Sequence, residues 1–170
     1  ARVSKTPGRT RLINFFQTTI ASPKGPQSVL LADLPGYGYA SVSHSERSGW
    51  QAMMEEYLSK RDNLRAVALL CDARRVVAPN VEELLFDETE LADYLRGLGR
   101  KVVPVLTKAD KLAKSERKPA AQILSRLLGG KAIVCAAEQG EGVDDLWIRL
   151  LTAASEKAII QGVAAVDRVL

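Results

Sequence analysis

Two acidic loops, each placed directly after an apolar run, hold the residues of this sequence best suited to chemistry. Asp33 ends the run "SVLLAD" and is followed by Pro35 and Gly36, and the segment "TKAD" (107–110) follows the run "KVVPVL". A glycine close to a carboxylate lets another group approach the backbone closely. The alternative for residues 33–36 is a simple turn, because Pro-Gly pairs are common turn formers.

The second loop, Thr107-Lys108-Ala109-Asp110, has the residues needed to recognise a guanine base. A carboxylate at a strand end can accept hydrogen bonds from the N1–H and the exocyclic amine of guanine, while the aliphatic stem of Lys108 lies along the base plane. Adenine presents an acceptor at N1, so it would leave the Asp110 carboxylate without a partner. The segment therefore predicts selectivity for guanine over adenine.

Further polar loops are expected at the same edge, because ligands of α/β sheets bind beyond the carboxyl ends of the parallel strands. These loops are Asp33–Gly36, Thr107–Asp110 and Cys135–Ala137, preceded in the chain by the basic segment "SKTPGRT" (4–10). A carboxylate, a lysine and a threonine hydroxyl in one crevice suit a magnesium-bound nucleoside triphosphate better than a redox cofactor.

The elements that must position these loops alternate between strand and helix. Two strands, 11–18 and 27–33, are joined by the turn-rich "ASPKGP" and are expected to pair antiparallel. Strands at 64–73, 101–110 and 131–137 are continuous apolar runs typical of strands buried on both faces. Helices are expected over 43–61, from an Asn80 cap to about Leu98, near 115–128, and after Gly142. This order predicts an α/β fold with helices on both faces of the sheet.

Composition excludes several classes of protein. A chain of 170 residues with 46% hydrophobic and 26% charged residues fits one globular domain, and no apolar run is long enough to span a membrane. Cys71 and Cys135 lie in apolar runs, which favours buried thiols in a reducing compartment. The net charge is +4, and residues 1–32 and 100–131 are strongly basic, which favours a polyanionic partner, with RNA first.

Taken together, these motifs resemble those of the EngB family of bacterial ribosome-assembly GTPases, within the translation-factor-like small GTPases. The resemblance rests on "SKTPGRT" and "LINFF" (4–16), "DLPGYGYA" (33–40), "EYLSKR" after Trp50, "CDAR" (71–74) and "VLTKADKL" (105–112). It implies a three-layer, Ras-like GTPase domain with a mostly parallel sheet and an antiparallel edge strand. It also implies GTP and GDP as ligands, Mg²⁺ as cofactor, and the ribosomal large subunit or its precursor as partner. A cytoplasmic, monomeric protein that does not bind membranes and is needed for cell growth and division is expected.

The resemblance also implies roles for individual residues. Thr10 corresponds to the switch threonine that coordinates Mg²⁺ and senses the γ-phosphate, and Asp33 to the acid that holds a metal-bound water. The N–H of Gly36 would reach the γ-phosphate, so Thr10 and Gly36 are the expected catalytic positions. The full set of expected nucleotide contacts is Gly8, Arg9, Thr10, Arg11, Leu12, Asp33, Leu34, Pro35, Gly36, Thr107, Lys108, Ala109, Asp110, Cys135, Ala136 and Ala137.

Three features depart from the family pattern. Cys135-Ala136-Ala137 stands where a serine pair is usual, a small change because that loop contacts guanine O6 through backbone N–H groups. Tyr37 follows Gly36 where many GTPases have a water-orienting glutamine, so slow intrinsic hydrolysis is expected. The phosphate-binding sequence G-x-x-x-x-G-K-[ST] does not occur in these residues.

The third departure leads to an expectation about the whole chain. Residues 1–170 are expected to form a single GTPase domain whose first strand and phosphate loop are not in the sequence given. Without that segment, they are expected neither to fold cooperatively nor to bind GDP. Two alternatives stay open. One is an RNA-binding module with a vestigial nucleotide site, and the other is a different ribosome-associated GTPase of the Era or EngA type.

Overall fold

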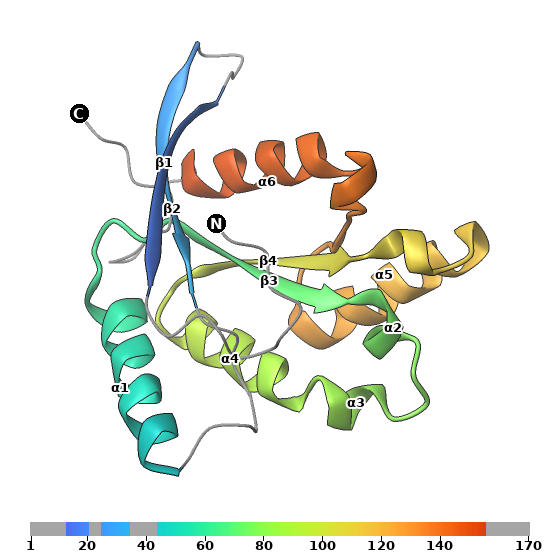
Figure 1. Ribbon diagram of the computed structural model, residues 1–170, viewed down its shortest axis with the longest axis horizontal. Coiled ribbons are helices and arrows are strands. Elements are labelled where there is room, and N and C mark those ends of the chain that lie inside the picture. Colours follow the sequence, from blue (N-terminus) through green and yellow to red (C-terminus); the bar gives the residue numbers. More distant parts are fainter. Residues whose placement is uncertain (1–12, 21–24, 35–43, 156–170) are drawn as a thin grey trace.

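The computed structural model describes residues 13–20, 25–34 and 44–155, and places their strands in two separate sheets. The first sheet pairs β1 (Asn14–Ile20) with β2 (Gln27–Asp33) in antiparallel register, with Asn14 opposite Asp33. The antiparallel pairing predicted from the sequence is confirmed, although β1 lies two to three residues further along the chain than expected. Figure 1 shows this pair as a two-stranded ribbon separate from the second sheet.

The second sheet is parallel, with the order β3-β4-β5. Its strands are β3 (Ala66–Asp72), β4 (Lys101–Thr107) and the short β5 (Ile133–Val134). The register sets Asp72 opposite Thr107, so β3 and β4 end side by side. A shared carboxyl edge is therefore a consequence of this register, as the parallel arrangement predicts.

Helices cover both faces of the parallel sheet, which gives the three-layer α/β architecture that the sequence predicts (Figure 1). On one face, Leu69 and Cys71 of β3 and Leu106 of β4 join the larger core cluster with several helices. On the other face, Val103 and Val105 of β4 pack with Leu150 of the last helix. The helices are α1 (His44–Lys60), α2 (Ala73–Val76), α3 (Val81–Leu84), α4 (Phe86–Gly97), α5 (Lys114–Leu128) and α6 (Val143–Ser155).

The helix predicted from Asn80 to Leu98 is divided in the structure at Leu85, into α3 and α4. The guanidinium of Arg75 donates to the carbonyl of Leu84 and pairs with Glu88, so it competes for an acceptor that a continuous helix would use. Asn80 occupies the N-cap position of α3, as predicted, but its side chain makes no capping hydrogen bond. Its amide donates instead to Glu83.

Two strand predictions also need correction. The run 131–137 forms a strand only over Ile133–Val134, because Cys135 already turns into the next loop. Leu70 of β3 is 62% exposed, so that strand is not buried on both faces along its whole length. Among the described strands, β3 lies at the edge of its sheet and pairs with β4. The predicted burial of Cys71 and Cys135 is confirmed.

A buried arginine ties the end of α1 to the start of β4. Arg100 is 4% exposed, and its guanidinium donates to the carbonyls of Leu58 (3.0 Å) and Ser59 (2.9 Å). These carbonyls belong to the last turn of α1, where a helix leaves backbone acceptors without partners. Among the described helices, none is both long and apolar enough to cross a lipid bilayer.

Candidate functional site

Three loops meet at the carboxyl edge of the parallel sheet, and hydrogen bonds connect each to its neighbour. The hydroxyl of Thr107 donates to the carbonyl of Cys71 (3.0 Å), which joins the ends of β4 and β3. The N–H of Cys135 donates to the carbonyl of Leu106 (2.8 Å), and the N–H of Ala109 donates to the carbonyl of Cys135 (3.1 Å). The structure therefore brings Thr107–Asp110 and Cys135–Ala137 together, as the sequence predicts.

Lys108 has the only positive φ (54°) of a non-glycine residue in the part of the chain that the structure describes. A left-handed conformation costs an ordinary L-residue about 1–2 kcal/mol, so the surroundings must hold it. The ammonium group of Lys108 donates to a carboxylate oxygen of Asp72 at 3.0 Å. The Lys108 side chain is thus fixed at its far end as well as at its backbone.

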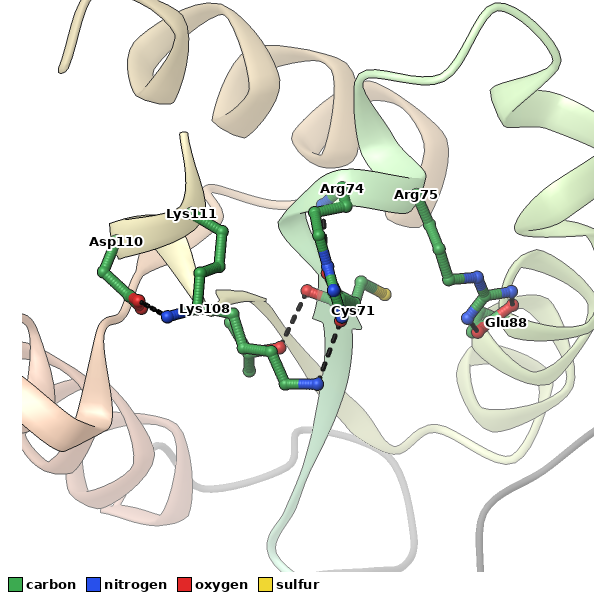
Figure 2. Close-up of polar contacts among 9 residues, drawn as sticks. Cys71, Arg74, Arg75, Glu88, Lys108, Asp110 and Lys111 are labelled. Carbon is green, nitrogen blue, oxygen red and sulfur yellow. Dashed lines mark hydrogen bonds and ion pairs between the residues drawn. The ribbon is translucent and has the colours of Figure 1, made fainter. Parts of the chain in front are cut away.

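Asp110 presents a charged carboxylate at this edge. It lies in a short 3₁₀ turn (Ala109–Lys111), its side chain is 11% exposed, and one oxygen lies 2.7 Å from the ammonium group of Lys111 (Figure 2). The hydrogen bond from Lys111 lowers the pKa of Asp110 below its usual range. Asp110 is therefore ionised at neutral pH and can act only as an acceptor.

Asp72 is a site residue that the sequence analysis missed. It is the last residue of β3 and caps the short helix α2, accepting from the N–H of Arg74 at 3.0 Å. The Arg74 side chain donates to both of its oxygens, and Lys108 adds another bond. These hydrogen bonds, chiefly that from the Arg74 side chain, hold the pKa of Asp72 well below its usual range. The signal was an aspartate directly between an apolar run and a helix, in "CDAR".

The loop after β5 has one backbone donor left for a ligand among the three predicted residues. The N–H of Cys135 donates to Leu106, and that of Ala136 donates to the carbonyl of Glu141 at 2.9 Å. We therefore expect Ala137, which is exposed, to be the residue of this loop whose N–H faces a base. The loop is held closed by the return bond from the N–H of Glu141 to the carbonyl of Ala136 (3.2 Å).

Two glycines in this loop allow a matched test of its packing. Gly142 (φ +75°) lies so close to β5 that an added Cβ would be 1.9 Å from the carbonyl oxygen of Val134, whereas a Cβ on Gly140 (φ +72°) would meet nothing within 4 Å. We expect Gly142→Ala to lower the melting temperature of the intact protein by about 8 °C or more, because β5 and the loop must move apart. Gly140→Ala carries the same backbone strain without the collision, and we expect a loss of only about 1 kcal/mol. Equal melting temperatures for the two variants would contradict this packing.

The remaining predicted site residues lie elsewhere or are not described. Asp33 is the last residue of β2, with an exposed side chain, and Leu34 packs against the larger core cluster. The predicted contacts that fall outside the described residues are Gly8, Arg9, Thr10, Arg11, Leu12, Pro35 and Gly36.

Solved structures with the same architecture are GTP-binding domains. A crystal structure of a probable GTP-binding protein engB superposes with a TM-score of 0.64 and 16% identity, covering 87% of this chain and 86% of that one. The FeoB G-domain from Methanococcus jannaschii superposes with a TM-score of 0.56 and 18% identity, covering 82% and 80%. At these identities the likeness shows the fold alone, and it confirms the predicted GTPase architecture.

Comparisons of the sequence with known proteins identify the family of this chain. A family model described as "50S ribosome-binding GTPase" matches residues 1–108. The probable GTP-binding protein EngB of Anaeromyxobacter dehalogenans (strain 2CP-C) is 44% identical over 163 residues, covering 93% of this chain and 72% of that protein. The one from Acidobacterium capsulatum is 39% identical over 157 residues, covering 92% and 71%. The chain therefore belongs to the EngB family of GTP-binding proteins, a family of GTPases.

Proposed function

We propose that this protein binds GTP and GDP through the carboxyl edge of its parallel sheet and hydrolyses GTP during assembly of the ribosomal large subunit. The observation that carries the proposal is the joining of the Lys108–Asp110 segment to the Cys135–Ala137 loop by the hydrogen bond from Ala109 to Cys135. In this proposal residues 1–170 act as one GTPase domain. The family model's description supports the ribosomal partner.

Base recognition uses both loops. The Asp110 carboxylate accepts from the N1–H and the exocyclic amine of guanine, and the N–H of Ala137 donates to guanine O6. Asp110 is paired with Lys111 at 2.7 Å, so guanine must compete with that ammonium group for the carboxylate. The aliphatic stem of Lys108 covers one face of the base. The lowered pKa of Asp110 supports its role as the acceptor in these contacts.

In this proposal, phosphate and metal binding are carried out by Thr10, ahead of β1, and by residues at and beyond the end of β2. Asp33 offers an exposed carboxylate there, and a hard oxygen ligand suits Mg²⁺. We propose that Asp33, through a bound water, and Thr10 hold the ion, and that the N–H of Gly36 contacts the γ-phosphate. Bound Mg²⁺ would neutralise charge that develops on the phosphates during transfer.

Hydrolysis by the protein alone is expected to be slow, because Tyr37 cannot orient the attacking water as a glutamine does. Single-turnover hydrolysis of GTP by the intact protein should therefore accelerate when purified large ribosomal subunits are added. Tyr37→Phe serves as the matched variant, and we expect it to keep the intrinsic rate within about twofold. Fast hydrolysis without ribosomal particles would contradict the proposed role of Tyr37.

Binding measurements on the intact protein test the alternative of an RNA-binding module with a vestigial nucleotide site. Such a module would bind ribosomal particles with equal affinity whether GTP, GDP or no nucleotide were present. The charge of residues 1–32 and 100–131 favours RNA binding in either case. Tight, magnesium-dependent GDP binding by the intact protein would exclude the vestigial site.

A further inference from the structure

The Asp72 carboxylate is the most heavily bonded acidic group at the carboxyl edge among the described residues. It accepts from the backbone N–H of Arg74 (3.0 Å), from Nε (3.0 Å) and Nη2 (2.6 Å) of the same residue, and from Nζ of Lys108 (3.0 Å). Its side chain is 17% exposed, while those of Arg74 and Lys108 are 61% and 57% exposed. The largely buried Asp72 carboxylate thus fixes the side-chain orientations of the exposed Arg74 and Lys108.

Lys108 is held both through the backbone of its neighbours and at the far end of its side chain. At its backbone, the preceding residue Thr107 donates to the carbonyl of Cys71, and the following residue Ala109 donates to Cys135. At its far end, Nζ donates to Asp72, the last residue of the neighbouring strand β3. The four-carbon stem is therefore stretched between β4 and β3 across the edge of the sheet.

We propose that Asp72 is a positioning residue for nucleotide binding, which holds the stem of Lys108 in place as the apolar surface on which the base lies. The inference rests on the proposed function, because it assigns a role within that base site. A lysine stem free in solvent samples many rotamers, and fixing it upon binding would cost conformational entropy. The ion pair with Asp72 removes that cost before the nucleotide arrives.

Asp72 acts on affinity and not on the choice of base. A stem that lies against the plane of a purine contacts guanine and hypoxanthine alike, whereas Asp110 faces the edge that distinguishes them. Loss of Asp72 should therefore weaken GDP and IDP by the same factor. A change in the contacts of Asp110 would instead alter the ratio of the two affinities, because hypoxanthine lacks the exocyclic amine.

The test is a double-mutant cycle on the intact protein with GDP and IDP as ligands. Asp72→Asn keeps a residue that can cap α2 but removes the charge that holds Lys108. Lys108→Met keeps an unbranched apolar stem without the ammonium group. We expect Asp72→Asn to lower both affinities about fivefold in the parent protein, and to change them by less than about 1.5-fold when Lys108 is already Met.

Arg74→Gln is the matched control, because it removes the other cation from Asp72 and leaves the Lys108 bond. We expect it to change GDP affinity by less than twofold. If Asp72→Asn failed to fold, as judged by its thermal unfolding, Asp72→Ser would take its place, because serine also caps helices.

Three results would overturn the inference. They are unchanged affinity in Asp72→Asn, an equal loss in the Lys108→Met background, and a shifted ratio of GDP to IDP affinity. A parent protein that bound neither nucleotide would overturn the proposed function itself, and this inference with it.

Discussion

Asp110→Asn is expected to lower the affinity of the intact protein for GDP at least about 100-fold and to raise its affinity for XDP. The carboxylate accepts two charge-assisted hydrogen bonds from guanine, and each such bond corresponds to about tenfold or more in affinity. An asparagine offers a donor where the carboxylate has an acceptor, which suits xanthine, whose carbonyl replaces the guanine amine. Titration calorimetry with GDP and XDP measures the two affinities for the parent protein and the variant.

Asp93→Asn is the matched control for this exchange of one carboxylate for an amide. Asp93 lies on α4 and pairs with Arg96, as Asp110 pairs with Lys111, but it is 65% exposed and belongs to a helix away from the carboxyl edge. We expect it to leave both affinities unchanged. If Asp110→Asn kept the parent preference for GDP, Asp110 would not contact the base.

Binding to large ribosomal particles is expected to be tighter in the GTP form than in the GDP form and to fall steeply with salt. The basic residues of the N-terminal segment, Arg2, Lys5, Arg9 and Arg11, flank the expected switch threonine, although they lie outside the described residues. Four phosphate contacts imply a slope near −3 in log K against log salt, or about a 60-fold loss for a fourfold rise in salt. Co-sedimentation with purified large subunits at several salt concentrations gives this slope.

Variants that each lack one basic side chain test which residues contact phosphate. Each of these basic residues changed to glutamine should reduce the magnitude of the slope by about one. The exposed Arg65 lies outside both basic segments, so Arg65→Gln should leave the slope unchanged. Equal binding with GTP and GDP, or binding that does not respond to salt, would show that nucleotide state does not control this surface.

Much of the fold could be predicted because its signals are local. The pairing of β1 with β2 follows from two short apolar strands around a turn, and the C-terminal end of α5 follows from Gly129 and Gly130 after a helical pattern. The acidic loops were recognisable because a polar segment after a buried strand has a known place at the edge of a parallel sheet. That reasoning placed Thr107–Asp110 beside Cys135–Ala137.

The sequence by itself therefore determined the class of fold, the order of its strands and the two loops that meet at the carboxyl edge of the parallel sheet. Only the tertiary structure decided how those residues are held. The division of the helix at Leu85 depends on Arg75 reaching from α2, and the bond from Lys108 to Asp72 joins residues 36 positions apart. The second of these contacts has no local signature, because it forms only when the register of β3 against β4 sets Asp72 opposite Thr107. Side-chain reach across neighbouring strands is a property of the folded sheet and not of either strand alone.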